Sequence, residues 1–150
     1  SYRNGDGELI QEEWIRDLVW MASRPHLILL DEWILVHAGV DPTTTLENQS
    51  AKKLLWIRSK FHNSSKTVDS RRTVVFGHSI THRVLGQSIG DIGRSEFNLE
   101  DGRPFWLGID TGACDSLSGW LTAIDLTSGD IVQANDVGDS RRPGKAFKRK

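Results

Sequence analysis

Two apolar runs in the chain end in the same way, and this recurrence constrains the fold more than any other feature. The segments LVHAG (35–39) and VFGHS (75–79) each place a histidine at the carboxyl end of an apolar run, beside glycine or alanine. In open α/β sheets, ligands bind outside the carboxyl ends of the strands, and neutral imidazole is a common ligand of divalent metals. The pattern predicts that His37 and His78 meet at one metal ion. The alternative for each is a half-buried, hydrogen-bonded histidine at a strand end.

The spacing of apolar residues predicts the other elements. Helices are expected at 11–22, with one apolar face, and at 51–61, where Ser50 caps the amino end. Strands are expected at five places, residues 26–30, 33–37, 73–76, 104–110 and 120–126. The first two read as a hairpin, with the first strand buried on both faces, and the last begins a second hairpin. Residues 86–103 are expected to form a long loop or irregular hairpin.

Composition excludes several classes of protein. With 150 residues, 37% apolar and 26% charged, the chain has the size and core of about one globular domain and is not disordered. It has no run of 18 apolar residues and no secretory signal, so neither a membrane span nor export is expected. The single cysteine, Cys114, is compatible with a reducing cytoplasm and reads as a bystander.

Charge is uneven along the chain. Residues 139–150 hold six Lys or Arg against one Asp. A tail of this kind can touch phosphate-rich partners, but the interpretation adopted is a solvated, disordered terminus. Residues 1–138 then form the folded part, and nucleic acid is not expected as a partner.

The remaining histidines have weaker claims to a site. His26 begins a strand, His62 falls in a polar connection, and His82 is assigned to a loop because Ser79-Ile80-Thr81 gives no strong helix signal. Asp110 ends a strand in GIDTG, where it either lines a pocket or starts a loop; the loop role is favoured.

Taken in order, the segments VHAGVDP, LLWIRSKF, TVVFGHS, GIDTGA and WLTAIDLTSG resemble the calcineurin-like metallophosphoesterases of the phosphoprotein phosphatase superfamily. The resemblance covers residues 30–132 and is closest to the bacterial branch, which includes serine/threonine protein phosphatases and diadenosine tetraphosphatases. It implies an α/β fold in which helices flank a β-sandwich.

The resemblance also implies roles for three residues. In this family the histidines at the positions of His37 and His78 ligate the second metal of a dinuclear centre, with Mn, Fe or Zn as the two divalent ions. Arg58, in LLWIR, stands where the family places an arginine near the substrate phosphate, and a guanidinium clamps phosphate oxygens bidentately. A surface arginine on a helix is the alternative for Arg58.

The sequence departs from the family in its amino-terminal half. The motifs GDxHG, GDxxDRG and GNH[ED], which supply the other metal ligands and the leaving-group acid, are absent. We therefore expect the carboxyl-terminal portion of a domain, inactive alone, whose partner is the missing amino-terminal half. The first residue, which is not Met, agrees with this expectation. A truncated sheet would expose unpaired edges and apolar surface, and so associate.

The expected function is that of the family. It is metal-dependent hydrolysis of phosphomonoesters, foremost phosphoserine or phosphothreonine in proteins, by a metal-activated water. Two alternatives stay open: a diadenosine tetraphosphatase or other nucleotide hydrolase, and a non-catalytic module that binds phosphate or protein.

Overall fold

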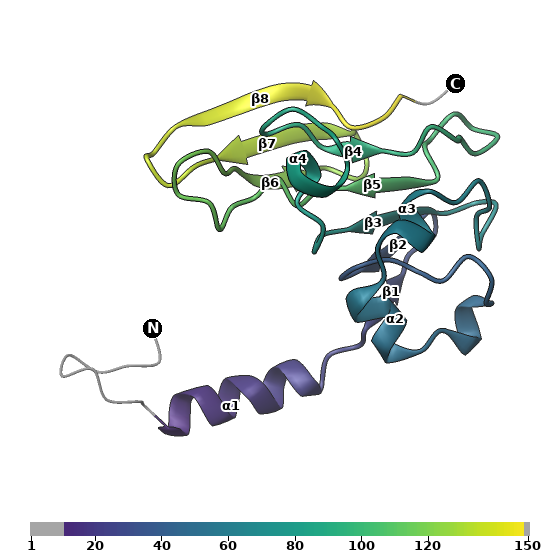
Figure 1. Cartoon of the computed structure of the whole chain (residues 1–150), viewed down its shortest axis with the longest axis horizontal. Coiled ribbons are helices and arrows are strands. Elements are labelled where there is room, and N and C mark those ends of the chain that lie inside the picture. Colours follow the sequence, from purple (N-terminus) through teal and green to yellow (C-terminus); the bar gives the residue numbers. More distant parts are fainter. Residues whose placement is uncertain (1–10, 149–150) are drawn as a thin grey trace.

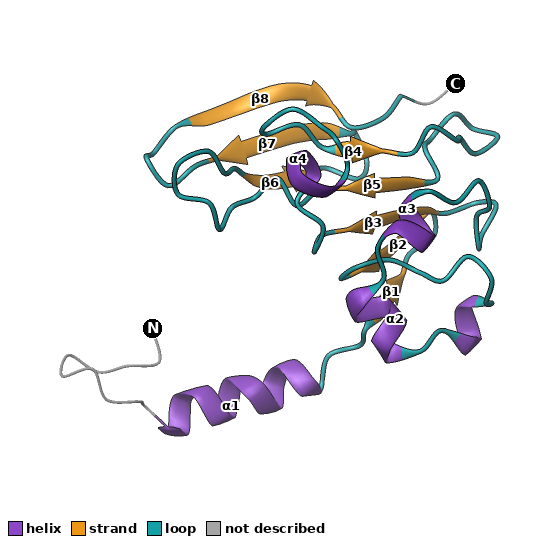
Figure 2. Cartoon of the chain, viewed as in Figure 1, coloured by secondary structure: helices purple, strands orange, loops and turns teal. Residues whose placement is uncertain are grey.

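Two β-sheets and a few short helices make up the computed structural model, which describes residues 11–148 (Figures 1 and 2). The helices are α1 (Gln11–Ala22), the 3₁₀ turn η1 (Leu46–Asn48), α2 (Ala51–Trp56), α3 (Ser59–His62) and α4 (Thr81–Val84). The strands are β1 (Leu27–Leu29), β2 (Trp33–Val36), β3 (Thr73–Phe76), β4 (Gly93–Arg94), β5 (Trp106–Gly108), β6 (Leu121–Ile124), β7 (Asp130–Ala134) and β8 (Ser140–Lys145). The mixed α/β class is confirmed.

The larger sheet has the order β1-β2-β3-β5-β4. Its three central strands run parallel, and the edge strands β1 and β4 are antiparallel to their neighbours. The smaller sheet, β6-β7-β8, is antiparallel throughout. The two predicted hairpins, β1-β2 and β6-β7, are both present.

Alternating side chains of the central strands divide the core between two faces. On one face, Ile34 and Val74 pack with Leu54 and Phe61 of the helical segment 51–62. On the other, Val75 and neighbouring residues pack against the smaller sheet and the segment that follows β8. The result is three layers: short helices, the larger sheet and the smaller sheet.

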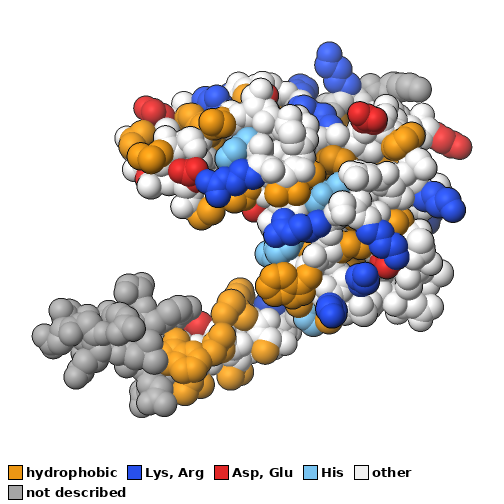
Figure 3. Space-filling model, in the orientation of Figure 1, with side chains coloured by type: hydrophobic (Ala, Val, Ile, Leu, Met, Phe, Trp, Pro, Cys, Tyr) orange, Lys and Arg blue, Asp and Glu red, His pale blue; other side chains and the backbone are white. Residues whose placement is uncertain are grey.

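Strand β1 is not buried as predicted. Ile28, Leu29 and Leu30 are all exposed, because β1 is an edge strand and no described element covers it. Helix α1 was predicted with its correct bounds, but it extends away from the two sheets (Figure 1). Its apolar side chains, among them Leu18 and Val19, lie in the open (Figure 3).

The expected helix over 51–61 is interrupted. Ser50 caps α2 as predicted, accepting a hydrogen bond from the Lys53 N–H at 3.4 Å. Ile57 then takes an extended backbone (φ −65°, ψ 145°), and α3 starts one residue after Arg58. Ile57 is buried in the core together with Leu54 and Phe61, which lie on either side of the break.

The prediction of a disordered tail is wrong for residues 140–145, which form β8 and pair with β7. Most side chains of this strand are exposed to solvent, whereas that of Arg141 contacts the sheet. Arg141 donates to the buried Gln133 at 2.7 Å and lies over the Trp120 ring. Ala146 and Phe147, which follow the strand, are buried in the core between the sheets. None of the helices in residues 11–148 has the length and hydropathy needed to cross a membrane.

Candidate functional site

Parallel pairing of β2 and β3 brings His37 and His78 together. Val36 pairs with Phe76, so the two strands end level with each other and the residues that follow leave the sheet at the same edge. The Gly77 N–H donates to the His37 carbonyl at 2.9 Å, which extends the ladder by one step. Nε2 of His37 lies 3.0 Å from Nδ1 of His78, with the ring planes inclined at 58°. The two histidines therefore meet, and the contact between them is a hydrogen bond from one ring to the other.

The backbone of His78 is left-handed, with φ of +58°, and it is the one non-glycine residue with positive φ in the described part of the chain. Such a conformation costs about 1–3 kcal/mol and concentrates at functional sites. A tight turn accompanies it, because the Ser79 N–H donates to the Gly77 carbonyl at 2.5 Å. No pattern in the sequence predicted this conformation of His78.

Burial and nearby charge lower the pKa of the His78 imidazole, which favours its neutral form. Burial lowers the pKa of His78 below its usual value, the charges of Arg58 and His37 lower it further, and Asp110 opposes them. Nε2 of His78 is buried and has no hydrogen-bond partner among residues 11–148. A neutral ring keeps a lone pair on one nitrogen, which metal coordination requires.

The two facing nitrogens lie at hydrogen-bond distance, 3.0 Å apart. Two nitrogens bound at about 2.1 Å to a tetrahedral ion lie ~3.4 Å apart, so the two rings would have to separate slightly to share an ion. Residues 11–148 contain no group of three or more His, Cys, Asp or Glu side chains arranged to hold an ion. Within the described residues the two histidines do not form a complete metal site.

The break between α2 and α3 directs Arg58 toward the same edge. Its Nη1 donates to the Ser79 hydroxyl at 3.0 Å and to the His78 carbonyl at 3.3 Å. Ser79 is fully buried, so the anchor is fixed while Arg58 itself is exposed. These contacts use one terminal nitrogen, and the guanidinium has donors on two others that an anion can engage.

Two further residues contact the side chains of the site. Ser79 anchors Arg58, and its position directly after His78 was the available signal. Trp56 meets the His78 ring edge-on, with centroids 5.5 Å apart, although 67% of its surface is exposed. Its place next to the Ile57-Arg58 pair in an apolar segment fits a wall of the site. Asp110 accepts a hydrogen bond from the Gly112 N–H at 3.1 Å, as the loop role predicts.

The other histidines are outside this hydrogen-bonded pair, although His26 lines one surface hollow together with His37. His62 is not in a polar connection but in α3, where it is buried and stacked on Phe76 with centroids 5.0 Å apart. His82 lies in the single turn α4 rather than a loop, because the segment that starts at Ile80 closes helical hydrogen bonds. His26 and Cys114 are exposed.

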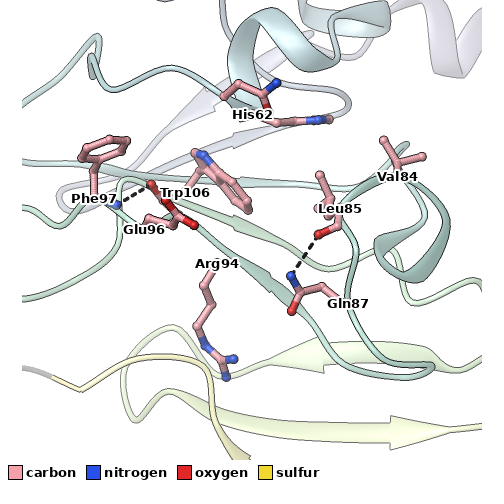
Figure 4. A pocket seen from close by; sticks show the side chains of 10 residues that line it. His62, Val84, Leu85, Gln87, Arg94, Glu96, Phe97 and Trp106 are labelled. Carbon is pink, nitrogen blue, oxygen red and sulfur yellow. Dashed lines mark hydrogen bonds between the residues drawn. The ribbon is translucent and has the colours of Figure 1, made fainter.

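A cavity of about 460 Å³ lies elsewhere, between the helical segment and the larger sheet (Figure 4). Neither the histidine pair nor Arg58 lines it. Its walls include His62 and Trp106, whose ring N–H groups are enclosed and make no hydrogen bond within the described residues. Both ring nitrogens are enclosed by protein atoms, so a ligand in the cavity could not form a hydrogen bond with either of them.

No protein-family model, curated protein or solved structure matches the chain. The geometry at the strand ends and the order of the motifs are therefore the grounds on which a function can be proposed.

Proposed function

We propose that the chain carries part of the active site of a calcineurin-like metallophosphoesterase, which hydrolyses phosphomonoesters, foremost phosphoserine or phosphothreonine in proteins. One observation carries the proposal: two imidazole nitrogens 3.0 Å apart and an anchored guanidinium lie at the carboxyl edge of adjacent parallel strands. Ligands of α/β sheets bind at this edge. A metal-ligand pair beside a phosphate clamp is the arrangement that phosphoester hydrolysis needs.

In this proposal the histidines and the arginine act on different parts of the reaction. His37 and His78 would hold one of two divalent ions, which when bound polarises the phosphoryl oxygens and activates a water. Arg58 binds and orients the phosphate through its free N–H donors, and it stabilises the charge that develops on the equatorial oxygens. The indole of Trp56 forms an apolar wall that excludes water from the His78 side.

A second ion needs a bridging carboxylate and further oxygen ligands. Since no set of three such side chains is found within residues 11–148, we propose that the amino-terminal half of the domain supplies them. The same finding supports the second candidate, a module that binds phosphate without turnover. The nucleotide-hydrolase alternative differs only in substrate.

The test is metal-dependent hydrolysis of p-nitrophenyl phosphate by this chain and by a form extended upstream in its coding sequence. We expect turnover with Mn²⁺ from the extended form only, and its loss in His37→Ala and His78→Ala. The His82→Ala variant, which removes a histidine of α4 outside the pair, is the control. Turnover by the 150-residue chain would refute the need for a second half, and an inactive extended form would refute the phosphoesterase.

A further inference from the structure

A hollow of about 230 Å³ begins next to the candidate site. Gly77, one residue before His78, and Asp110, which follows β5, form its near end. Because β3 and β5 are parallel neighbours, these residues leave the sheet at the same edge as the histidine pair. The near end of the hollow is therefore one residue along the chain from His78.

The far wall of the hollow is apolar. Ile109, Ala113, Trp120 and Leu121 line it, and 66% of the Leu121 surface is exposed. An exposed leucine next to an indole gains free energy when a ligand covers it. The wall therefore favours an apolar group.

The polar groups of this wall already have partners. The Thr111 hydroxyl donates to the Trp120 carbonyl at 2.5 Å and contacts the Thr122 hydroxyl, which also accepts from Gln133 at 2.8 Å. The guanidinium of Arg141 lies 4.2 Å from the Trp120 ring centroid. These contacts fix the wall in place, so binding there loses little conformational entropy.

Asp110 sets the charge preference of the near end. Its carboxylate is held by the Gly112 N–H at 3.1 Å and lies close enough to act on the charge of His78. A like charge placed in the hollow is repelled by this carboxylate. A polyphosphate chain or an acidic side chain extending from the bound phosphate in this direction is therefore disfavoured.

We propose that the hollow binds an apolar side chain flanking the phosphorylated residue of a peptide, so that the substrate is a phosphoserine or phosphothreonine peptide with apolar neighbours. The inference rests on the proposed function, because it needs the phosphate at Arg58. It separates the protein substrates from the nucleotide substrates, whose additional phosphates would face Asp110.

The test uses the full chain with Mn²⁺ and four peptides of equal length, with binding followed by NMR titration. Three carry phosphoserine flanked on both sides by Leu, Ser or Asp, and the fourth is the Leu peptide without phosphate. We expect the Leu phosphopeptide to bind about tenfold more tightly than the Ser peptide, as for one buried aliphatic side chain, and the Asp peptide to bind most weakly.

Three variants locate the preference. Leu121→Ser should remove the advantage of the Leu phosphopeptide, whereas Leu117→Ser, whose side chain is 96% exposed and outside the hollow, should keep it. Asp110→Asn retains an oxygen that accepts from the Gly112 N–H, and it should improve binding of the Asp peptide several-fold.

Failure of the two proposals can be told apart with Arg58→Ala. If the phosphopeptides bind equally well and all lose affinity in Arg58→Ala, the hollow is not a subsite and the inference is overturned while the phosphate site stands. If phosphate adds nothing to binding in the wild-type chain, the proposed function fails and the inference fails with it.

Discussion

At the scale of single residues, the positive φ of His78 predicts how substitutions there change the free energy of unfolding and metal binding. Asparagine tolerates positive φ well, whereas a β-branched residue does not. His78→Asn should therefore keep most of the free energy of unfolding, and His78→Val should lose about 1–2 kcal/mol or more. Both remove the imidazole that faces His37, so both should lose metal binding. Urea denaturation and metal titration of the two variants measure the two effects, and equal stability of both would contradict the strained backbone.

His62 gives the chain a predictable dependence of stability on pH. Burial of the imidazole, aided by the charges of Arg58 and His78, lowers the pKa of His62 from 6.5 to about 4. Above pH 6.5 the ring is neutral in both states. Between these values the unfolded chain binds the proton first, so the free energy of unfolding should fall as pH falls, by ~1.4 kcal/mol per pH unit.

The variant His62→Phe isolates this contribution. It keeps an aromatic ring stacked on Phe76 but cannot titrate. Urea titrations at pH 8, 6 and 4.5 give the free energy of unfolding of both proteins. As pH falls, the wild type should lose stability relative to the variant. A difference independent of pH would show that His62 is not the buried neutral group described.

At the scale of elements, the close approach of β2 to α3 depends on Gly39. This residue has φ of +141°, and a Cβ there would overlap the ring of Phe61. Gly39→Ala should lower the free energy of unfolding by about 2–4 kcal/mol, the sum of overpacking and an unfavourable φ. Because Phe61 and Arg58 belong to one short segment, it should also displace the arginine from the site.

Gly138→Ala is the matched control for this change. Gly138 also has positive φ, at +90°, but nothing lies within 4 Å of the added methyl group. Its cost should be conformational only, about 1 kcal/mol. If both variants lose the same free energy of unfolding, the absence of a side chain at Gly39 is not what allows β2 and α3 to pack closely.

The sequence predicted those elements whose apolar pattern is self-contained. Strands β2 and β3, the β6-β7 hairpin and α1 appear where apolar periodicity placed them, and the rule for strand ends predicted the contact between His37 and His78. The apolar pattern gave wrong predictions where packing against a neighbouring element decides whether a side chain is buried. The apolar run 27–30, of which β1 forms the first three residues, looks buried until the sheet order places it at an edge.

Tertiary contacts also decide the parts of the site that the sequence missed. The interruption before Arg58 lies at Ile57, whose extended backbone no local pattern predicts, and the anchor for Arg58 depends on a turn at Ser79. Strand β8 looks like a charged tail because only Arg141 and the two apolar residues after it show inward contacts. No local pattern contains this information.

At the scale of the whole molecule, uncovered apolar surface predicts association. The exposed residues of α1 and the open edge of β1 form the surface that the sequence led us to expect of an incomplete sheet (Figure 3). Sedimentation velocity should show mass rising with protein concentration. Leu18→Glu should reduce the effect, and Arg16→Gln, which changes the charge of the same helix equally, should not. A monomer at all concentrations would contradict this expectation.

The central claim is that His37 and His78 act together as ligands of one metal ion. The most direct measurement is a titration of the chain with Zn²⁺, which binds such nitrogen ligands more tightly than Mn²⁺, followed by NMR of the imidazole ring protons. We predict that the signals of both rings shift together and saturate, that the His82 signal stays unchanged, and that His78→Ala abolishes the shift at His37. If His37 still shifts in that variant, or if the two rings respond at different Zn²⁺ concentrations, the claim of a shared ion is wrong.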